Sequence, residues 1–176
     1  MRLNGLSPKH DMSFFHAGTD LKLLILVATA NSAPLALRWL SGRNAFHALD
    51  FGITVWDGKP LFGPSKTWAG LVAAILSCSL VAPLLSLPVE AGAHGGIAAM
   101  AGDLGTSFIK RRLGLASSAP APGLDQLAEA ALPLLVLRGF LAFSWLDLLV
   151  VLTVFILGEM AIAKILHRLG LRDPPF

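Results

Sequence analysis

The sequence predicts an all-α integral membrane protein, a bundle of about five transmembrane helices with cytoplasmic loops that form the functional site. Composition carries the first part of this prediction, because the 176 residues are 55% hydrophobic and only 14% charged. Soluble domains contain about a quarter charged residues. The apolar residues also form separate runs that approach the ~20 residues needed to cross a bilayer, without the period-two alternation of barrel strands.

The apolar runs divide the chain into an N-terminal leader, residues 1–19, and a single transmembrane domain, residues 20–176. The expected spans are residues 21–40, 68–87, 95–109, 127–143 and 145–166. Pro34 interrupts the first run, so a kinked helix is expected there. The alternative is a secretory signal peptide with a small-residue cleavage site at Ala28 to Ala30. We expect a retained helix because the leader is partly acidic and the apolar pattern resumes after Pro34.

The distribution of basic residues orients the bundle in the cell membrane. Three regions on one side carry most of them: Arg38, Arg43, Lys59 and Lys66; Lys110, Arg111 and Arg112; and Lys164, Arg168 and Arg172. The positive-inside rule places these regions in the cytoplasm. Because the basic residues sit at the ends of apolar segments and form no single stripe, nucleic acid is not an expected partner.

The stretch WDGKPLFGPSKTWAG, from Trp56 to Gly70, is a polar loop between two apolar runs. Ser65 and Thr67 are candidate helix N-caps, and a helix start offers free N–H groups and positive dipole to an anion. Lys66 adds a charge. A P-loop is excluded because two residues separate the second glycine of the stretch from Lys66. The alternative is a juxtamembrane turn in which Lys66 reaches anionic headgroups.

A second group of polar residues begins with Asp103, which lies inside the third apolar run. Ser107 and Lys110 follow at spacings of four and three, so one helical face carries all three side chains. An ionisable residue within a span indicates a functional site by default. With Asp125 at the start of the next helix, the pattern predicts a site for a divalent metal and a polyphosphate. The alternative is an ion pair of Asp103 with Lys110 or Lys66.

The segments DGKPLFGPSKTWAG, GDLGTSFIKRRLGL and LDQL together resemble the CDP-archaeol synthase family, which is related to the CDP-diacylglycerol synthases. The resemblance covers most of the chain, from the first span to the last helix. It implies a five-helix membrane nucleotidyltransferase that uses CTP and Mg²⁺ to convert an archaeal phosphatidic-acid analogue to CDP-archaeol, releasing pyrophosphate. The implied partners are CTP, a membrane lipid phosphate and the bilayer. Assembly into a homodimer is left open.

The resemblance also implies roles for particular residues. Asp103 and Asp125 match the carboxylates expected to hold Mg²⁺, and Lys66 and Lys110 complete the expected catalytic set. The remaining matched residues are expected to bind substrate: Asp57, Lys59, Ser65, Thr67, Ser107, Arg111 and Arg112.

Two departures from the family pattern stand near these motifs. Ala69 occupies a position that is usually arginine, which removes one potential phosphate contact. After the DQL motif the chain has Ala128 and then Glu129, so a third carboxylate is displaced by one residue, a rotation of about 100° on a helix. These features indicate a bacterial branch of the family and leave the native lipid open.

Two other functions remain open from the sequence. The first is a cytidylyltransferase for ester-linked phosphatidic acid. The second is a non-catalytic transporter or scaffold in which Asp103 and Glu159 line an ion path, although no internal repeat supports a transporter. Binding of CTP in the presence of Mg²⁺ distinguishes the enzyme from the non-catalytic protein.

Overall fold

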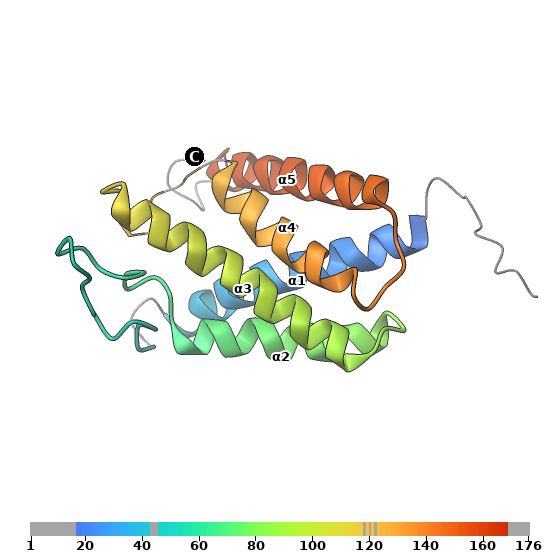
Figure 1. Ribbon diagram of the computed structural model, residues 1–176, viewed down its shortest axis with the longest axis horizontal. Coiled ribbons are helices and arrows are strands. Elements are labelled where there is room, and N and C mark those ends of the chain that lie inside the picture. The colour runs from blue at the N-terminus through green and yellow to red at the C-terminus, as the bar shows by residue number, and fades with distance from the viewer. Residues whose placement is uncertain (1–16, 43–45, 118, 120, 122, 169–176) are drawn as a thin grey trace, which may run out of the picture.

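The computed structural model describes residues 17–42, 46–117, 119, 121 and 123–168. Within these residues the chain forms the helices α1 (Ala17–Ser41), α2 (Trp68–Leu84), α3 (Val89–Arg112), α4 (Leu124–Leu137) and α5 (Trp145–Arg168). Successive helices run in alternating directions along one long axis, and the polar loop between α1 and α2 projects beside the C-terminal end of α3 (Figure 1). The all-α prediction is confirmed, while leader residues 1–16 lie outside the described part of the chain.

The helix boundaries differ from the predicted spans most at the start of α3 and at the end of α4, and α1 begins at Ala17, within the predicted leader. α3 begins at Val89 rather than Gly95, because Pro88 takes the N-cap position with an extended backbone that suits a helix start. α4 ends at Leu137 rather than residue 143. The residues after α4 lead to the start of α5, which has a reciprocal cap. The Ser144 N–H donates to the Asp147 carboxylate, and the Asp147 N–H donates to the Ser144 hydroxyl.

The first apolar run belongs to the bundle. Leu23, Leu26, Val27 and Ala30 of α1 are almost completely buried in the common core. α1 packs against α2, α3, α4 and α5, and the helix continues through Pro34. The structure therefore uses this run as a packed helix of the domain.

α2 and α3 approach each other closely through glycines. A Cβ atom on Gly92 would lie 2.3 Å from the carbonyl oxygen of Cys78, and one on Gly96 would lie 2.9 Å from the Cα of Ile75. The two glycines are four residues apart, so they lie on one face of α3. Small residues at this spacing let membrane helices pack backbone to backbone.

The outer surface of the bundle is largely apolar. By length and composition, α1 and α5 are suited to cross a membrane, and α2 is a shorter apolar helix of 17 residues. Large apolar side chains point outward along the helices, among them Leu76, Leu80, Leu84, Leu149, Leu157 and Ile162. Soluble monomers rarely expose apolar surface on this scale, so the surface fits a lipid environment.

Candidate active site

The polar loop between α1 and α2 folds as an irregular hairpin, residues 46–67, here called the polar hairpin. Antiparallel bridges join Ala48 to Thr67 and Thr54 to Pro60. The Leu49 N–H donates to the Lys66 carbonyl at 2.7 Å, which ties the two ends of the hairpin together. The base of the hairpin therefore holds Lys66 directly ahead of α2.

Asp50 organises the interior of the polar hairpin, a role that the sequence analysis did not identify. This buried carboxylate accepts hydrogen bonds from the N–H groups of Gly52 at 3.1 Å, Phe62 at 2.9 Å and Gly63 at 2.8 Å. Burial alone would raise the pKa of Asp50, but these backbone hydrogen bonds outweigh it and hold the pKa below its usual value. The Asp-x-Gly spacing of Asp50 and Gly52 is the sequence signal that points to such a turn.

Replacing Asp50 by asparagine is expected to loosen the polar hairpin and lower stability by about 2–3 kcal/mol, because charge-assisted hydrogen bonds are lost and an amide NH₂ faces N–H donors. The folded pKa is depressed, so the carboxylate contributes fully above its unfolded pKa near 3.8 and less as the pH falls through the folded value. The stability gap between wild type and variant should therefore narrow in acid.

Thermal unfolding across pH and hydrogen exchange at the Phe62 and Gly63 amides measure this prediction. Asp57→Asn is the matched control, because it changes a carboxylate of the same hairpin that pairs with Arg112 and accepts no hydrogen bond from the Phe62 or Gly63 N–H. Equal exchange rates at the two amides in Asp50→Asn and in the wild type would contradict the assigned role.

Thr67 begins α2 as predicted. Its side chain accepts a hydrogen bond from the Gly70 N–H at 3.1 Å, and its backbone is extended, as an N-cap requires. Ser65, the other candidate cap, instead contacts the α3–α4 loop through the Ser117 hydroxyl at 3.1 Å. The polar hairpin is thus joined to the segment that follows α3.

Gly63 brings the polar hairpin against Arg111. Its φ of +94° lies in the left-handed region, and a Cβ there would stand 3.1 Å from the Ser117 hydroxyl and 3.4 Å from a terminal nitrogen of Arg111. Arg111 is buried and donates to the Ala116 carbonyl at 2.7 Å. Its guanidinium therefore lies against the polar hairpin at Gly63.

Lys66 and Asp103 form an ion pair between the polar hairpin and α3. This is one of the two pairings that the sequence left open. Glu129 of α4 lies close to Asp103, near enough for the two carboxyl groups to interact. The helices meet here because Gly102 has no side chain: a Cβ at Gly102 would lie 2.3 Å from the Ala128 carbonyl oxygen. The displaced carboxylate of Glu129 is thereby brought to Asp103.

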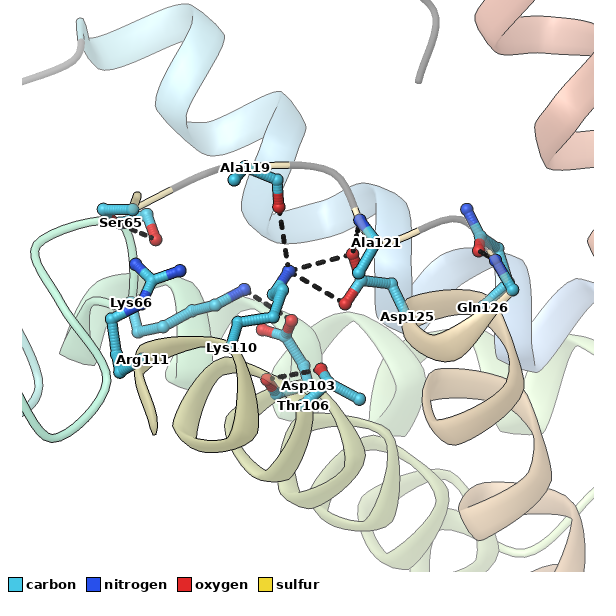
Figure 2. A network of polar contacts seen from close by, with 12 residues as sticks. Ser65, Lys66, Asp103, Thr106, Lys110, Arg111, Ala119, Ala121, Asp125 and Gln126 are labelled. Carbon is cyan, nitrogen blue, oxygen red and sulfur yellow. Dashed lines mark hydrogen bonds and ion pairs between the residues drawn. The ribbon is translucent and has the colours of Figure 1, made fainter. Parts of the chain in front are cut away.

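Lys110 and Asp125 form a second ion pair, 2.8 Å long, between α3 and α4. The Lys110 ammonium also donates to the Ala119 carbonyl at 3.2 Å, and Asp125 accepts from the Ala121 N–H at 3.1 Å. Figure 2 shows both ion pairs at the same end of α3, with Ala119 and Ala121 beside Lys110 and Asp125. Asp125 therefore fixes both a lysine and the loop.

Three of the predicted substrate-binding residues form a separate cluster. Arg112 lies 3.2 Å from the Asp57 carboxylate and donates to the Pro60 carbonyl at 2.6 Å, while Lys59 donates to the Arg112 carbonyl at 2.8 Å. These contacts attach the polar hairpin to the last turn of α3. Ser107 is buried one helical turn from Asp103 and shares its face of the helix.

Among the described residues, no group of three or more histidine, cysteine, aspartate and glutamate side chains is arranged to hold a metal ion. Asp103 and Asp125 each contact their own lysine. Asp103, which is paired with Lys66, also lies near Glu129, and a cation between the two carboxylates would relieve their repulsion. Mg²⁺ binds through one or two carboxylates plus substrate phosphates, so this pair fits it.

An apolar helical bundle with lysine–carboxylate pairs gathered at one end defines a membrane protein with a charged site. The family described as CarS-like, CDP-archaeol synthase, matches residues 89–176. The CDP-archaeol synthase of Staphylothermus marinus is 31% identical over 84% of this chain and 81% of its own length. That of Thermofilum pendens is 34% identical over 84% and 75%. The protein therefore belongs to the CDP-archaeol synthase family, whose members are CTP-dependent nucleotidyltransferases.

Two further comparisons agree with this assignment. The CDP-archaeol synthase of Hyperthermus butylicus is 42% identical over 59% of this chain and 62% of its own length. A solved structure of an intramembrane enzyme for archaeal membrane lipids biosynthesis superposes with a TM-score of 0.71 and 28% identity, covering 81% of this chain and 90% of that one. This likeness and the apolar helices assign the protein to the membrane.

Proposed function

We propose that the protein transfers CMP from CTP to the phosphate of an archaeal-type ether lipid, giving CDP-archaeol and pyrophosphate in a Mg²⁺-dependent reaction. The observation that carries this proposal is the convergence of Lys66, Asp103, Lys110 and Asp125 from three chain segments at one end of the bundle. The names of the relatives support the lipid class, since the three relatives named above are CDP-archaeol synthases.

The chemistry requires cations and positioning above all. An oxygen of the lipid phosphate attacks the α-phosphorus of CTP, the bond from that phosphorus to the bridging oxygen of the β-phosphate breaks, and pyrophosphate leaves with the electron pair. Both reactants are anionic and charge spreads over phosphoryl oxygens in the transition state. No general base is needed, because a phosphate monoester is largely ionised near neutral pH.

We assign the basic residues by their places in the site. Lys66 and Lys110 would neutralise the leaving pyrophosphate, because their ammonium groups come from two segments that meet at the end of α3. Arg111 would bind the lipid phosphate with its guanidinium fork. Arg112, Asp57 and Lys59 act on the substrate only through the polar hairpin that they fix to α3.

We assign the cation to Asp103 and Glu129 and give Asp125 the role of holding Lys110. When bound, Mg²⁺ would neutralise the CTP phosphates. The proximity of Asp103 and Glu129 supports this choice, whereas the sequence alone favoured Asp103 with Asp125. Glu129 would thus supply the second carboxylate that binds the cation.

The proposed topology is multi-pass, with all five helices crossing the cell membrane and the site facing the cytoplasm. The end of the bundle that holds the site also carries the basic residues Lys59, Lys66, Lys110, Arg111 and Arg112, as the positive-inside rule expects. CTP, a cytoplasmic nucleotide, would then reach the site directly.

The decisive experiment measures pyrophosphate release by the purified protein with CTP and Mg²⁺ against a panel of ether- and ester-linked lipid phosphates. Release that needs both CTP and the ether lipid, and is absent with ATP, is the expected result. Pyrophosphate release with the ester lipid alone would change the proposed lipid substrate and leave the proposed transfer of CMP unchanged. A folded protein that neither binds CTP nor releases pyrophosphate would be a non-catalytic scaffold or transporter.

A further inference from the structure

The polar hairpin exposes three large apolar side chains along its first half, between Phe51 and the turn at Trp56. Phe51 is 70% exposed, Ile53 56% and Trp56 84%, although the rest of the hairpin is rich in polar and glycine residues. Nothing in the proposed chemistry uses these side chains. Here they are called the apolar tip.

The depth of the apolar tip along the bundle can be obtained from its aromatic contacts. The Trp56 ring lies 6.4 Å from the Phe108 ring of α3, and the Phe51 ring lies 6.3 Å from the Trp68 ring at the first residue of α2. Phe108 follows the first residue of α3, Val89, by nineteen positions, a rise of about 28 Å along a helix. This rise matches the ~30 Å hydrocarbon thickness of a bilayer. If Val89 lies at one membrane surface, Phe108 and Trp56 lie at the other.

Two cations and one carboxylate lie beside the apolar tip, with Asp57 paired to Arg112. The Arg112 guanidinium lies 4.8 Å from the centre of the Phe108 ring and 5.9 Å from that of Trp56. Lys59, which donates to the Arg112 carbonyl, adds a second cation beside the same aromatic residues. Tryptophan next to basic side chains is typical of the headgroup level, where an amphipathic ring and a cation both find partners.

We propose that the apolar tip, Phe51, Ile53 and Trp56, inserts into the boundary between headgroups and acyl chains of the membrane that the helices span. The occupant of this surface is the bilayer, and Arg112, whose guanidinium is paired with Asp57, supports the Trp56 ring from the protein side. The polar hairpin is then held from two sides, by Asp50 from within and by lipid at the apolar tip. Lys66 lies at the base of the same hairpin. Contact between the apolar tip and the membrane therefore helps to fix the position of Lys66 in the active site.

Fluorescence quenching in vesicles tests this inference without using enzyme activity, so its failure is separate from failure of the proposed reaction. The full chain is reconstituted in phosphatidylglycerol vesicles whose acyl chains carry bromine, with Trp56 as the single tryptophan and the other three changed to phenylalanine. A matched variant keeps only Trp145, which is 61% exposed at the first residue of α5. We expect Trp56 to lose as much fluorescence as Trp145 and to resist aqueous iodide.

Strong iodide quenching of Trp56 without quenching by brominated lipid would overturn the inference, because the hairpin would then lie in water. Protection from both quenchers would also overturn it, since a second copy or another protein would cover the tip. If the single-tryptophan variant does not fold, Ile53→Cys carries a nitroxide label instead. The native Cys78 is buried, so the label reports position 53, and accessibility to oxygen above that to a water-soluble relaxation agent is expected.

Discussion

Replacing Lys66 by methionine and Asp103 by asparagine together is expected to restore the stability that either single change removes, while CTP-dependent activity stays lost. Each single variant leaves one charge of the ion pair without its partner. Such a loss costs about 3–5 kcal/mol in a fully buried pair. The cost here should be smaller, because the two side chains are 23% and 16% exposed. The double variant removes both charges.

CTP-dependent activity should stay low in both single variants and in the double variant, even though the double variant regains stability. If Lys66 neutralises the leaving group and Asp103 holds the cation, each single variant and the double variant should lose on the order of 10²-fold or more in the rate of pyrophosphate release. Thermal unfolding in detergent and the release assay measure the two properties. Glu90→Gln, an exposed carboxylate in the first turn of the same helix, is the control. A double variant that regains activity along with stability would show that the ion pair is purely structural.

Gly102→Ala is expected to destabilise the bundle by about 1–3 kcal/mol or more and to abolish most activity. The new Cβ would lie 2.3 Å from the Ala128 carbonyl oxygen and 3.2 Å from the Glu129 nitrogen. Both are backbone atoms, so α3 and α4 must move apart, and Asp103 would separate from Glu129. The loss of activity should therefore exceed what the loss of folded protein explains.

Gly105→Ala on the same helix is the matched control. A Cβ at Gly105 meets nothing within 4 Å, so this change should leave activity intact and raise stability by up to about 1 kcal/mol, since alanine favours helix. Unfolding temperature and pyrophosphate release of the two variants are compared at equal amounts of folded protein. Indistinguishable behaviour of Gly102→Ala and Gly105→Ala would contradict the close approach of α3 and α4 as the basis of the site.

Several features of the site were predictable because they depend on neighbours in the sequence. Thr67 precedes an apolar run, so its capping role followed from position alone, and the structure confirms it. The sequence also indicated that Asp103 and Lys110 lie on one face of a helix, although it did not decide which lysine Asp103 contacts. The predicted pairing of Asp103 with Asp125 on one metal stays a prediction, and the structure gives each of them a different lysine.

Other features depend on contacts between distant segments. Glu129 looked displaced when it was compared with a motif along a single helix, but its position relative to Asp103 is set by the crossing of α3 and α4 at Gly102. Asp50 carried no family motif and no regular periodicity. Its importance comes from the return of Phe62 and Gly63 to its carboxylate, which only the folded hairpin shows.

The sequence by itself determined the helical class, the order of the helices and the end of the bundle that carries the charges, because helix formation and hydropathy act over short stretches of chain. The tertiary structure decided which carboxylate meets which lysine, that Arg112 fixes the polar hairpin to α3, and that Glu129 reaches Asp103. These pairings depend on how closely two backbones approach, and that distance is set jointly by glycines and loops far apart in the sequence.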